Sequence, residues 1–303
     1  MVVGRTSISP DGTYLASIYE TEVGESVIVV DITARQEMAY IWGGKFLNWH
    51  PNGREFLFIQ QTETDLGLWL VAADTGQYRL LSQTADSAAI SPDGQILAYA
   101  DDTSGIWLSN TDGSQPRQVS DFGATVFAWS PDSRYLLYGE YPSGGDRTDT
   151  PPPLPHLWLM DRAGAEKRLL NSSWESGITF AAHQHPVWSP TGRYIAYSSP
   201  LDPGFSYWQE KKDYRDDPLY AFRNTGVYVE DVQTGELWLV AQNALDATWS
   251  PDGSLLAVSK MDENEQVDIW LISLVSRDLL RATNTLELDL YPFWLPLPQN
   301  NGR

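Results

Sequence analysis

The sequence predicts an all-β protein made of repeats of four short strands. A proline-containing turn phrase returns six times, with its prolines at positions 10, 51, 92, 131, 190 and 251. The first three intervals are about 40 residues, which suits one four-stranded unit, and the last two are about 20 residues longer. No helical period of useful length competes with this pattern. We therefore predict a β-propeller of six four-stranded blades.

The turn phrase forms the corner between the first two strands of each blade, strands A and B. Its first copy reads Ser9-Pro10-Asp11-Gly12. Proline presets φ for a tight turn, Asp or Asn tolerates the next position, and glycine takes the left-handed position that closes the hairpin. The other copies occupy residues 50–53, 91–94, 130–133, 189–192 and 250–253.

The flanking residues predict the four strands. Strand A ends in an apolar pair such as Ala128-Trp129, and strand B follows the turn, as in Tyr135-Leu136-Leu137-Tyr138. Strand C recurs in the form Ile106-Trp107-Leu108, and strand D in the form Arg168-Leu169-Leu170. The repeats begin near residues 2, 44, 85, 124, 182 and 244, and residues 1–303 are predicted to form a single propeller domain.

A further copy of strand A is predicted at residues 288–296, where Phe293-Trp294-Leu295-Pro296 matches the other strand-A ends. It packs as an extra strand on a six-bladed ring, or it belongs to a seventh blade that is incomplete. Six blades are the favoured count and seven are the alternative.

The Trp-Ser-Pro-Asp-Gly phrase, the apolar strand B and the Ile-Trp-Leu strand C resemble TolB-like, WD-repeat-like β-propellers over roughly residues 2 to 295. The Trp-Asp ending of true WD repeats is absent. The resemblance implies the propeller fold and leaves the function open, because such propellers serve as protein-binding scaffolds, as lyases and as gating domains of peptidases.

Composition excludes several classes of function. Acidic residues number 40 against 20 basic ones, and the net charge of −20 makes nucleic acids and anionic membranes poor partners. With no cysteine, disulfides, thiol catalysis and thiolate metal sites are excluded. No stretch approaches the roughly 20 apolar residues of a membrane span, and residues 1–5 have no signal-peptide core. We expect a soluble protein whose compartment stays open. It would be exported if a leader precedes this sequence.

Two long insertions are the strongest functional signal. They fall in the strand B-to-C connections of the fourth and fifth blades, at residues 141–155 and 199–225. In a four-stranded meander these connections leave on the same face as the D-to-A connections, which include the long segment 171–185. Because propellers carry function in their loops, we predict a binding rim on this face.

The predicted binding residues are those that the repeat does not explain. Nine of the 13 tryptophans fall at repeat positions, and Trp42 and Trp238 are assigned to packing between blades. Aromatic side chains in loops anchor peptides or stack on sugars, although packing of the loop on its own domain is the alternative. Arg215 adds positive charge, or it pairs with a neighbouring aspartate. The predicted binding set is Trp174, His183, His185, Tyr207, Trp208, Tyr214 and Arg215.

His183 and His185 are also the predicted metal ligands. Two residues apart on a strand, they would point the same way and offer two imidazoles, but no third ligand is identifiable. Hydrogen bonding at a channel mouth is the alternative, so no cofactor is predicted and a divalent ion stays an open alternative. Signatures of serine hydrolases, zinc peptidases, phosphate-binding loops and dinucleotide sites are missing, and no catalytic residue is predicted.

The leading interpretation is a non-catalytic propeller that binds a protein or peptide through the rim of blades four and five. The alternatives are a glycan-binding or metal-assisted polysaccharide-lyase-like propeller, and a sensor or scaffold module of a longer protein. The oligomeric state is not determined by the sequence.

Overall fold

The computed structural model describes residues 4–21, 24–61, 66–101, 105–121, 124–140, 156–170, 186–201, 219–285, 287–290, 292 and 294. Strands make up 58% of the structure and helix 2%, which confirms the all-β prediction. The chain divides into two compact units, Met1–Glu140 with Met160–Lys167, and Tyr141–Leu159 with Arg168–Arg303. The single domain and the count of six blades stay predictions.

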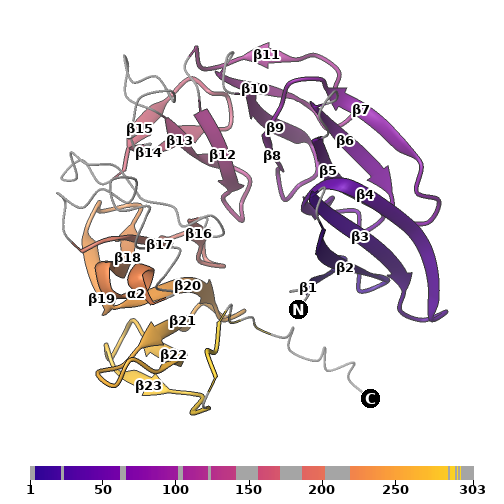
Figure 1. Ribbon diagram of the computed structural model, residues 1–303. Helices are drawn as coiled ribbons and strands as arrows, with labels where there is room; N and C mark the ends of the chain where they lie inside the picture. Colours follow the sequence, from indigo (N-terminus) through magenta and orange to yellow (C-terminus); the bar gives the residue numbers. More distant parts are fainter. Residues whose placement is uncertain are drawn as a thin grey trace, which may run out of the picture. The chain divides into compact units, whose positions relative to one another are not determined.

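The first two repeats share one antiparallel sheet of seven strands, in sequence order (Figure 1). Its strand β4 pairs with β3 through residues 36–44 and with β5 through residues 44–49, so it serves as strand D of one repeat and strand A of the next. Gly43 has a φ of 77°, and a Cβ on Gly44 would lie 2.1 Å from the carbonyl oxygen of Ile59. These two glycines let one strand continue where the sequence predicted a connection. The strands are β1 (Gly4–Ile8), β2 (Tyr14–Thr21), β3 (Gly24–Asp31), β4 (Gln36–Trp49), β5 (Glu55–Gln61), β6 (Leu66–Ala72) and β7 (Tyr78–Ser82).

The later repeats form four sheets of four antiparallel strands, each in the predicted order A, B, C, D. The first comprises β8 (Ser87–Ile90), β9 (Ile96–Asp101), β10 (Gly105–Asn110) and β11 (Arg117–Gln118). The second comprises β12 (Ala124–Trp129), β13 (Tyr135–Glu140), β14 (His156–Asp161) and β15 (Lys167–Leu169). The third comprises β16 (Val187–Trp188), β17 (Tyr194–Pro200), β18 (Thr225–Asp231) and β19 (Leu237–Gln242). The last comprises β20 (Ala244–Trp249), β21 (Leu255–Met261), β22 (Val267–Ser273) and β23 (Leu279–Arg281).

The serine of the turn phrase closes the turn with its side chain. Ser91 Oγ donates a hydrogen bond to Asp93 Oδ1 at 2.6 Å and accepts one from the backbone N–H of Ile96 at 2.9 Å. Gly94 has a φ of 70°, as predicted for the last position. Ser9, Ser130 and Ser250 repeat the bond to the aspartate two residues on. Because a small hydroxyl both donates and accepts here, serine belongs to the turn as much as proline and glycine do.

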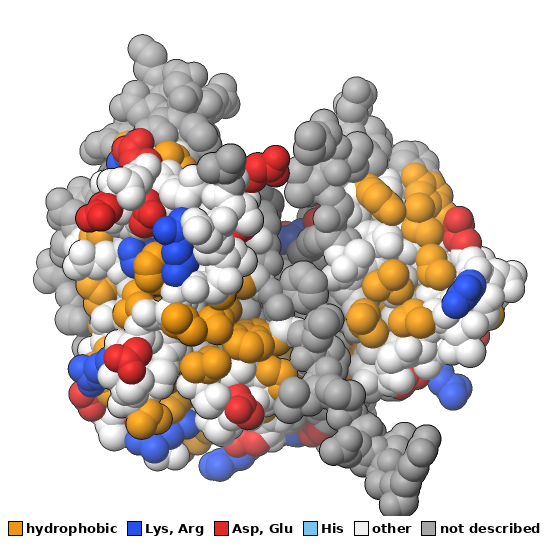
Figure 2. Space-filling view, turned by 90° about the horizontal axis from the view of Figure 1, so that it is seen from below, with side chains coloured by type: hydrophobic (Ala, Val, Ile, Leu, Met, Phe, Trp, Pro, Cys, Tyr) orange, Lys and Arg blue, Asp and Glu red, His pale blue; other side chains and the backbone are white. Residues whose placement is uncertain are grey.

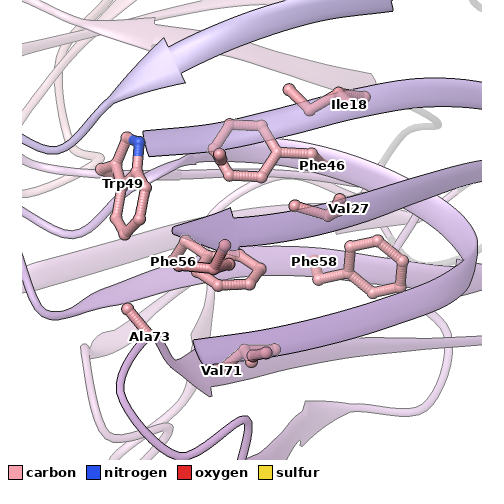
Figure 3. Packing of buried hydrophobic residues seen from close by; sticks show 11 residues of the cluster. Ile18, Val27, Phe46, Trp49, Phe56, Phe58, Val71 and Ala73 are labelled. Atoms are coloured by element: carbon pink, nitrogen blue, oxygen red, sulfur yellow. The ribbon is translucent and has the colours of Figure 1, made fainter. Parts of the chain in front are cut away.

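Aromatic side chains fill the space between the first two repeats. Phe46, Trp49 and Phe56 lie with ring centroids 5.4 to 6.1 Å apart. Figure 3 shows Phe46 between Ile18 and Val27, which belong to the first repeat. All five side chains are buried, so the second repeat covers the apolar face of the first.

One tryptophan contact recurs between successive repeats. The indole N–H at the end of a strand A donates to a backbone carbonyl in strand A of the preceding repeat. This bond joins Trp49 to Ser7 at 3.3 Å, Trp129 to Ala89 at 3.1 Å, Trp249 to Val187 at 3.2 Å, and Trp294 to Thr248 at 3.2 Å. Trp294 thus makes the contact of a strand-A tryptophan, although neither Pro292 nor Trp294 is assigned to a strand.

Candidate functional site

The predicted binding residues lie outside the described part of the chain. This applies to Trp174, His183, His185, Tyr207, Trp208, Tyr214 and Arg215, and to the insertion at 141–155. Their roles stay predictions. The structure does describe the residues on either side of the second insertion, which form its base.

The base of this insertion is closed by a strand pair and a short helix. Pro200 at the end of β17 pairs with Thr225 at the start of β18. The N–H of Leu201 donates to the carbonyl oxygen of Asn224 at 2.8 Å. Helix α2 (Tyr220–Asn224) leads the chain back into β18. The described segments on either side of residues 202–218 are therefore hydrogen-bonded to each other.

Helix α2, which the sequence did not predict, packs on the neighbouring sheet. Phe222 is 4% exposed and shares an apolar cluster with Leu245, Met261 and Val267 of strands β20 to β22. Met261 and Val267 flank the turn between β21 and β22, which is a strand B-to-C connection. The insertion base and this turn therefore lie at the same end of their two sheets. An apolar anchor outweighs the low helix propensity of such a short segment.

An ion pair adds to this attachment at the surface. The Arg223 guanidinium donates to Glu265 Oε1 at 2.9 Å, and Glu265 lies in the β21–β22 turn. Glu265 is exposed and Arg223 is only partly buried, so the pair orients the helix more than it stabilises it.

Other charged groups at this end of the sheet have partners within the sheet. Lys260 donates to the carbonyl oxygen of Met261 at 3.0 Å and lies 5.4 Å from the ring centroid of Trp270. Burial lowers the pKa of Lys260. Asp268, which is fully buried, pairs with Arg281, and Arg281 also contacts Asp262 at 3.3 Å. These charges stabilise the sheet end and do not form an open ionic site.

A buried polar group lies on β17 and β18, the paired strands that flank the insertion. The rings of Tyr197 and Tyr228 stack with centroids 6.2 Å apart, and Tyr197 Oη donates to Glu230 Oε2 at 3.4 Å. Glu230 is 3% exposed, and burial raises the pKa of Tyr228. Sequence reasoning gave Tyr197, Tyr228 and Glu230 no role in a site. The signal that could have found them is a tyrosine in each of two paired strands, with a glutamate two residues after the second.

No group of three or more His, Asp or Glu side chains is placed to hold a metal ion within the described ranges. The predicted pair His183 and His185 lies outside those ranges, so the metal prediction stays open. No helix that the structure describes is long and apolar enough to cross a membrane.

Comparison with solved structures shows the fold. TolB from Acinetobacter baumannii superposes with a TM-score of 0.53 at 14% identity, over 91% of this chain and 62% of that one. An oligogalacturonate lyase in complex with manganese gives 0.58 at 17% identity, over 89% and 76%. The tricorn protease gives 0.60 at 15% identity, over 90% and 29%. No protein-family model matches the chain, and neither does any curated protein sequence.

These similarities confirm the resemblance stated from the sequence, since the chain has the fold of TolB-like β-propellers. The chain spans less than two thirds of the TolB structure and less than a third of the tricorn protease. At such identities the likeness defines the fold and no activity.

Proposed function

We propose that the protein is a non-catalytic β-propeller scaffold that binds a protein or peptide through the loops of the fourth and fifth repeats. The six repeats would each form one blade of a single domain comprising residues 1–303. With a net charge of −20, neither nucleic acid nor an anionic membrane is an expected partner.

The observation that supports this proposal most strongly is the anchored base of the second insertion. Phe222 is buried among side chains of the neighbouring sheet, and the N–H of Leu201 holds the carbonyl of Asn224. An aromatic-rich loop on such a fixed base presents a surface of the kind that binds partners.

The test uses peptides selected from a displayed random library against the whole protein. For the tightest peptide, Trp208→Ala should weaken binding by about 2 kcal/mol, or roughly 30-fold, if Trp208 is a central anchor. Tyr40→Ala is the matched control, because Tyr40 is an aromatic residue that is 55% exposed and lies in the other compact unit. Equal affinity of wild type and Trp208→Ala would reject the assigned role of the insertion.

The alternative is a glycan-directed or metal-assisted lyase-like propeller, favoured by the similarity to a manganese-bound oligogalacturonate lyase. Here His183 and His185 would hold a divalent ion while Trp174, Tyr207 and Trp208 contact the sugar. Elemental analysis of purified protein distinguishes the two proposals. A bound divalent ion that disappears in His183→Ala supports the alternative, and wild-type protein without such an ion supports the scaffold.

A further inference from the structure

A concave site lies between two neighbouring sheets, at the end opposite to α2. It is a pocket of about 240 Å³ between the third and fourth four-stranded sheets. Tyr194 follows a turn phrase at the start of β17, and Arg277 lies in the turn between β22 and β23. The lining residues used below are Tyr194, Trp238, Leu239, Ile272, Ser273 and Arg277.

In other repeats, glycine occupies the turn position that corresponds to Arg277. In the strand C-to-D turn, a Cβ on Gly76 would lie 3.2 Å from Ala39 Cβ, and one on Gly113 would lie 3.4 Å from Leu81 Cδ2. A Cβ on Gly164 would lie 2.6 Å from Val119 Cγ1. Gly164 and Gly76 thus fit tightly against the preceding repeat, whereas Gly113 makes an ordinary van der Waals contact and a Cβ on Gly235 of the fifth repeat would meet nothing within 4 Å. At Gly164 the turn can sit this close only because glycine has no side chain.

The last repeat differs from these glycine-containing repeats in two ways, and the first repeat shares the first of them, since Arg35 takes the same turn position. Arg277 replaces the glycine and keeps the left-handed backbone, with a φ of 59° that an L-residue adopts only at some cost. Trp238 stands on β19 where the first repeat has Ala39, since Val229 pairs with Trp238 and Val29 pairs with Ala39. A contact between two small residues is therefore replaced by an indole and a guanidinium with a pocket between them.

The aromatic wall of the pocket is held in place. Trp238 Nε1 donates to Glu236 Oε1 at 2.7 Å, and the indole meets Tyr194 edge to face at 6.1 Å. Tyr194 in turn stacks on Trp249 at 6.2 Å, and the Arg193 guanidinium lies 5.1 Å from the Tyr194 ring centroid. Because both aromatic residues have fixed orientations, the pocket keeps its shape without a ligand.

Two polar groups face the pocket with unused hydrogen-bond donors. Within the described ranges the Arg277 guanidinium makes no ion pair and no side-chain hydrogen bond. Ser273 Oγ accepts a bond from the N–H of Ser276 at 3.3 Å, which leaves its own hydrogen to donate. Leu239 and Ile272 supply apolar surface. Figure 2 views the molecule from the side where β22 and β23 lie in Figure 1, and it shows apolar side chains gathered among charged ones on that face.

We propose that this pocket binds a small organic carboxylate with an aromatic or branched aliphatic body. The body lies against Trp238 and the apolar wall, and the carboxylate accepts hydrogen bonds from Arg277 and Ser273. A volume below the roughly 300 to 1,000 Å³ of pockets for drug-sized ligands fits one ring-sized group and excludes a folded peptide. This site is independent of the proposed rim, which lies at the other end of the sheets.

Phenylacetate is the probe, compared with the neutral phenylacetamide and the cationic phenethylamine. Binding to the whole protein is followed by ligand-detected NMR and by tryptophan fluorescence. We expect wild type to bind phenylacetate at least tenfold more tightly than either analogue, because only the carboxylate pairs with Arg277. Equal affinity for the three probes, or no binding of phenylacetate at millimolar concentration, overturns the proposal.

Two variants take their residues from other repeats, so they should fold. Arg277→Gly restores the turn residue of Gly76, and Trp238→Ala restores the residue of Ala39. Each should weaken phenylacetate binding at least tenfold. The matched control is Arg35→Gly, since Arg35 occupies the same turn position of the first repeat with a φ of 54° and does not line the pocket. Loss of binding in Arg35→Gly, or full binding in Arg277→Gly, contradicts the assignment.

Discussion

At the scale of single residues, the turn phrase is stabilised by a hydroxyl–carboxylate bond as well as by backbone geometry. Asp252 Oδ1 accepts hydrogen bonds from Ser250 Oγ at 2.6 Å and from Ser254 at two atoms. These bonds favour the charged form of the carboxyl and lower the pKa of Asp252 to about 2. Asn52 takes the aspartate position in the second repeat, so the charge itself is not essential to the turn.

The lowered pKa of Asp252 predicts that the stability of the fold decreases in acid. A folded pKa below the ordinary aspartate value of 3.8 gives stability that is present above that value and is lost as the pH falls toward about 2. An NMR titration should place the pKa of the Asp252 carboxyl near 2, and Ser250→Ala should move it toward the ordinary value. A carboxyl that titrates at 3.8 in the wild type would show that the serine bond is not formed in solution.

The strand-A tryptophans predict an unequal series of stability losses. Trp129 is 5% exposed and its indole N–H is bonded to Ala89, so Trp129→Ala should cost about 3 to 5 kcal/mol. Trp188 is half-buried, and among the described residues its indole nitrogen has no hydrogen-bond partner. Trp188→Ala should therefore lower the free energy of unfolding clearly less than Trp129→Ala does. Urea unfolding measures both, and equal losses would contradict this ranking.

At the scale of elements, α2 fixes the base of the second insertion through one buried ring. Phe222→Ala should cost about 3 kcal/mol locally, because it removes the ring from the cluster with Leu245 and Met261. Proteolytic cleavage within residues 202–218 should become faster. Arg223→Ala is the matched control, since an exposed ion pair contributes less than about 1 kcal/mol. Unchanged cleavage in Phe222→Ala would show that the insertion does not depend on this anchor.

The strands could be predicted from the sequence because the turn phrase recurs in every repeat and tryptophans mark strand A or strand C in every repeat but the first. Neither the continuity of β4 nor the presence of helix α2 could be predicted from the sequence. Gly43 and Gly44 look like a turn until the close approach of Ile59 is known, and Phe222 finds its partners in another repeat. Of the candidate rim, the sequence located the insertion but not the anchor beneath it. Trp238 was assigned to packing, and it also lines a pocket because Arg277 replaces a glycine.

At the scale of the whole molecule, the residues near the end of the sequence extend the repeat contact. Trp294 donates to Thr248 as Trp249 donates to Val187. Beside Trp294, Ile269 and Leu271 are half-buried, whereas the corresponding Val227 and Val229 are fully buried by the next repeat. The last sheet therefore carries a partial cover where the sheet before it carries a complete one.

Removal of this cover should destabilise the protein. Deletion of residues 286–303 should lower the melting temperature by several degrees, because it exposes the apolar face of β21 and β22. Trp294→Ala should reproduce much of that loss, while Leu280→Ala, at a side chain that is 65% exposed, should leave the melting temperature unchanged. Identical melting of the deleted and complete chains would mean that the Trp294 contact contributes nothing.

The proposed rim is tested most directly by hydrogen exchange of the whole chain with and without a selected peptide. The account predicts slowed exchange in residues 202–218 and in α2, with the turn phrases at 189–192 and 250–253 unaffected. Protection confined to those turn phrases would contradict it and would assign binding to the opposite end of the sheets.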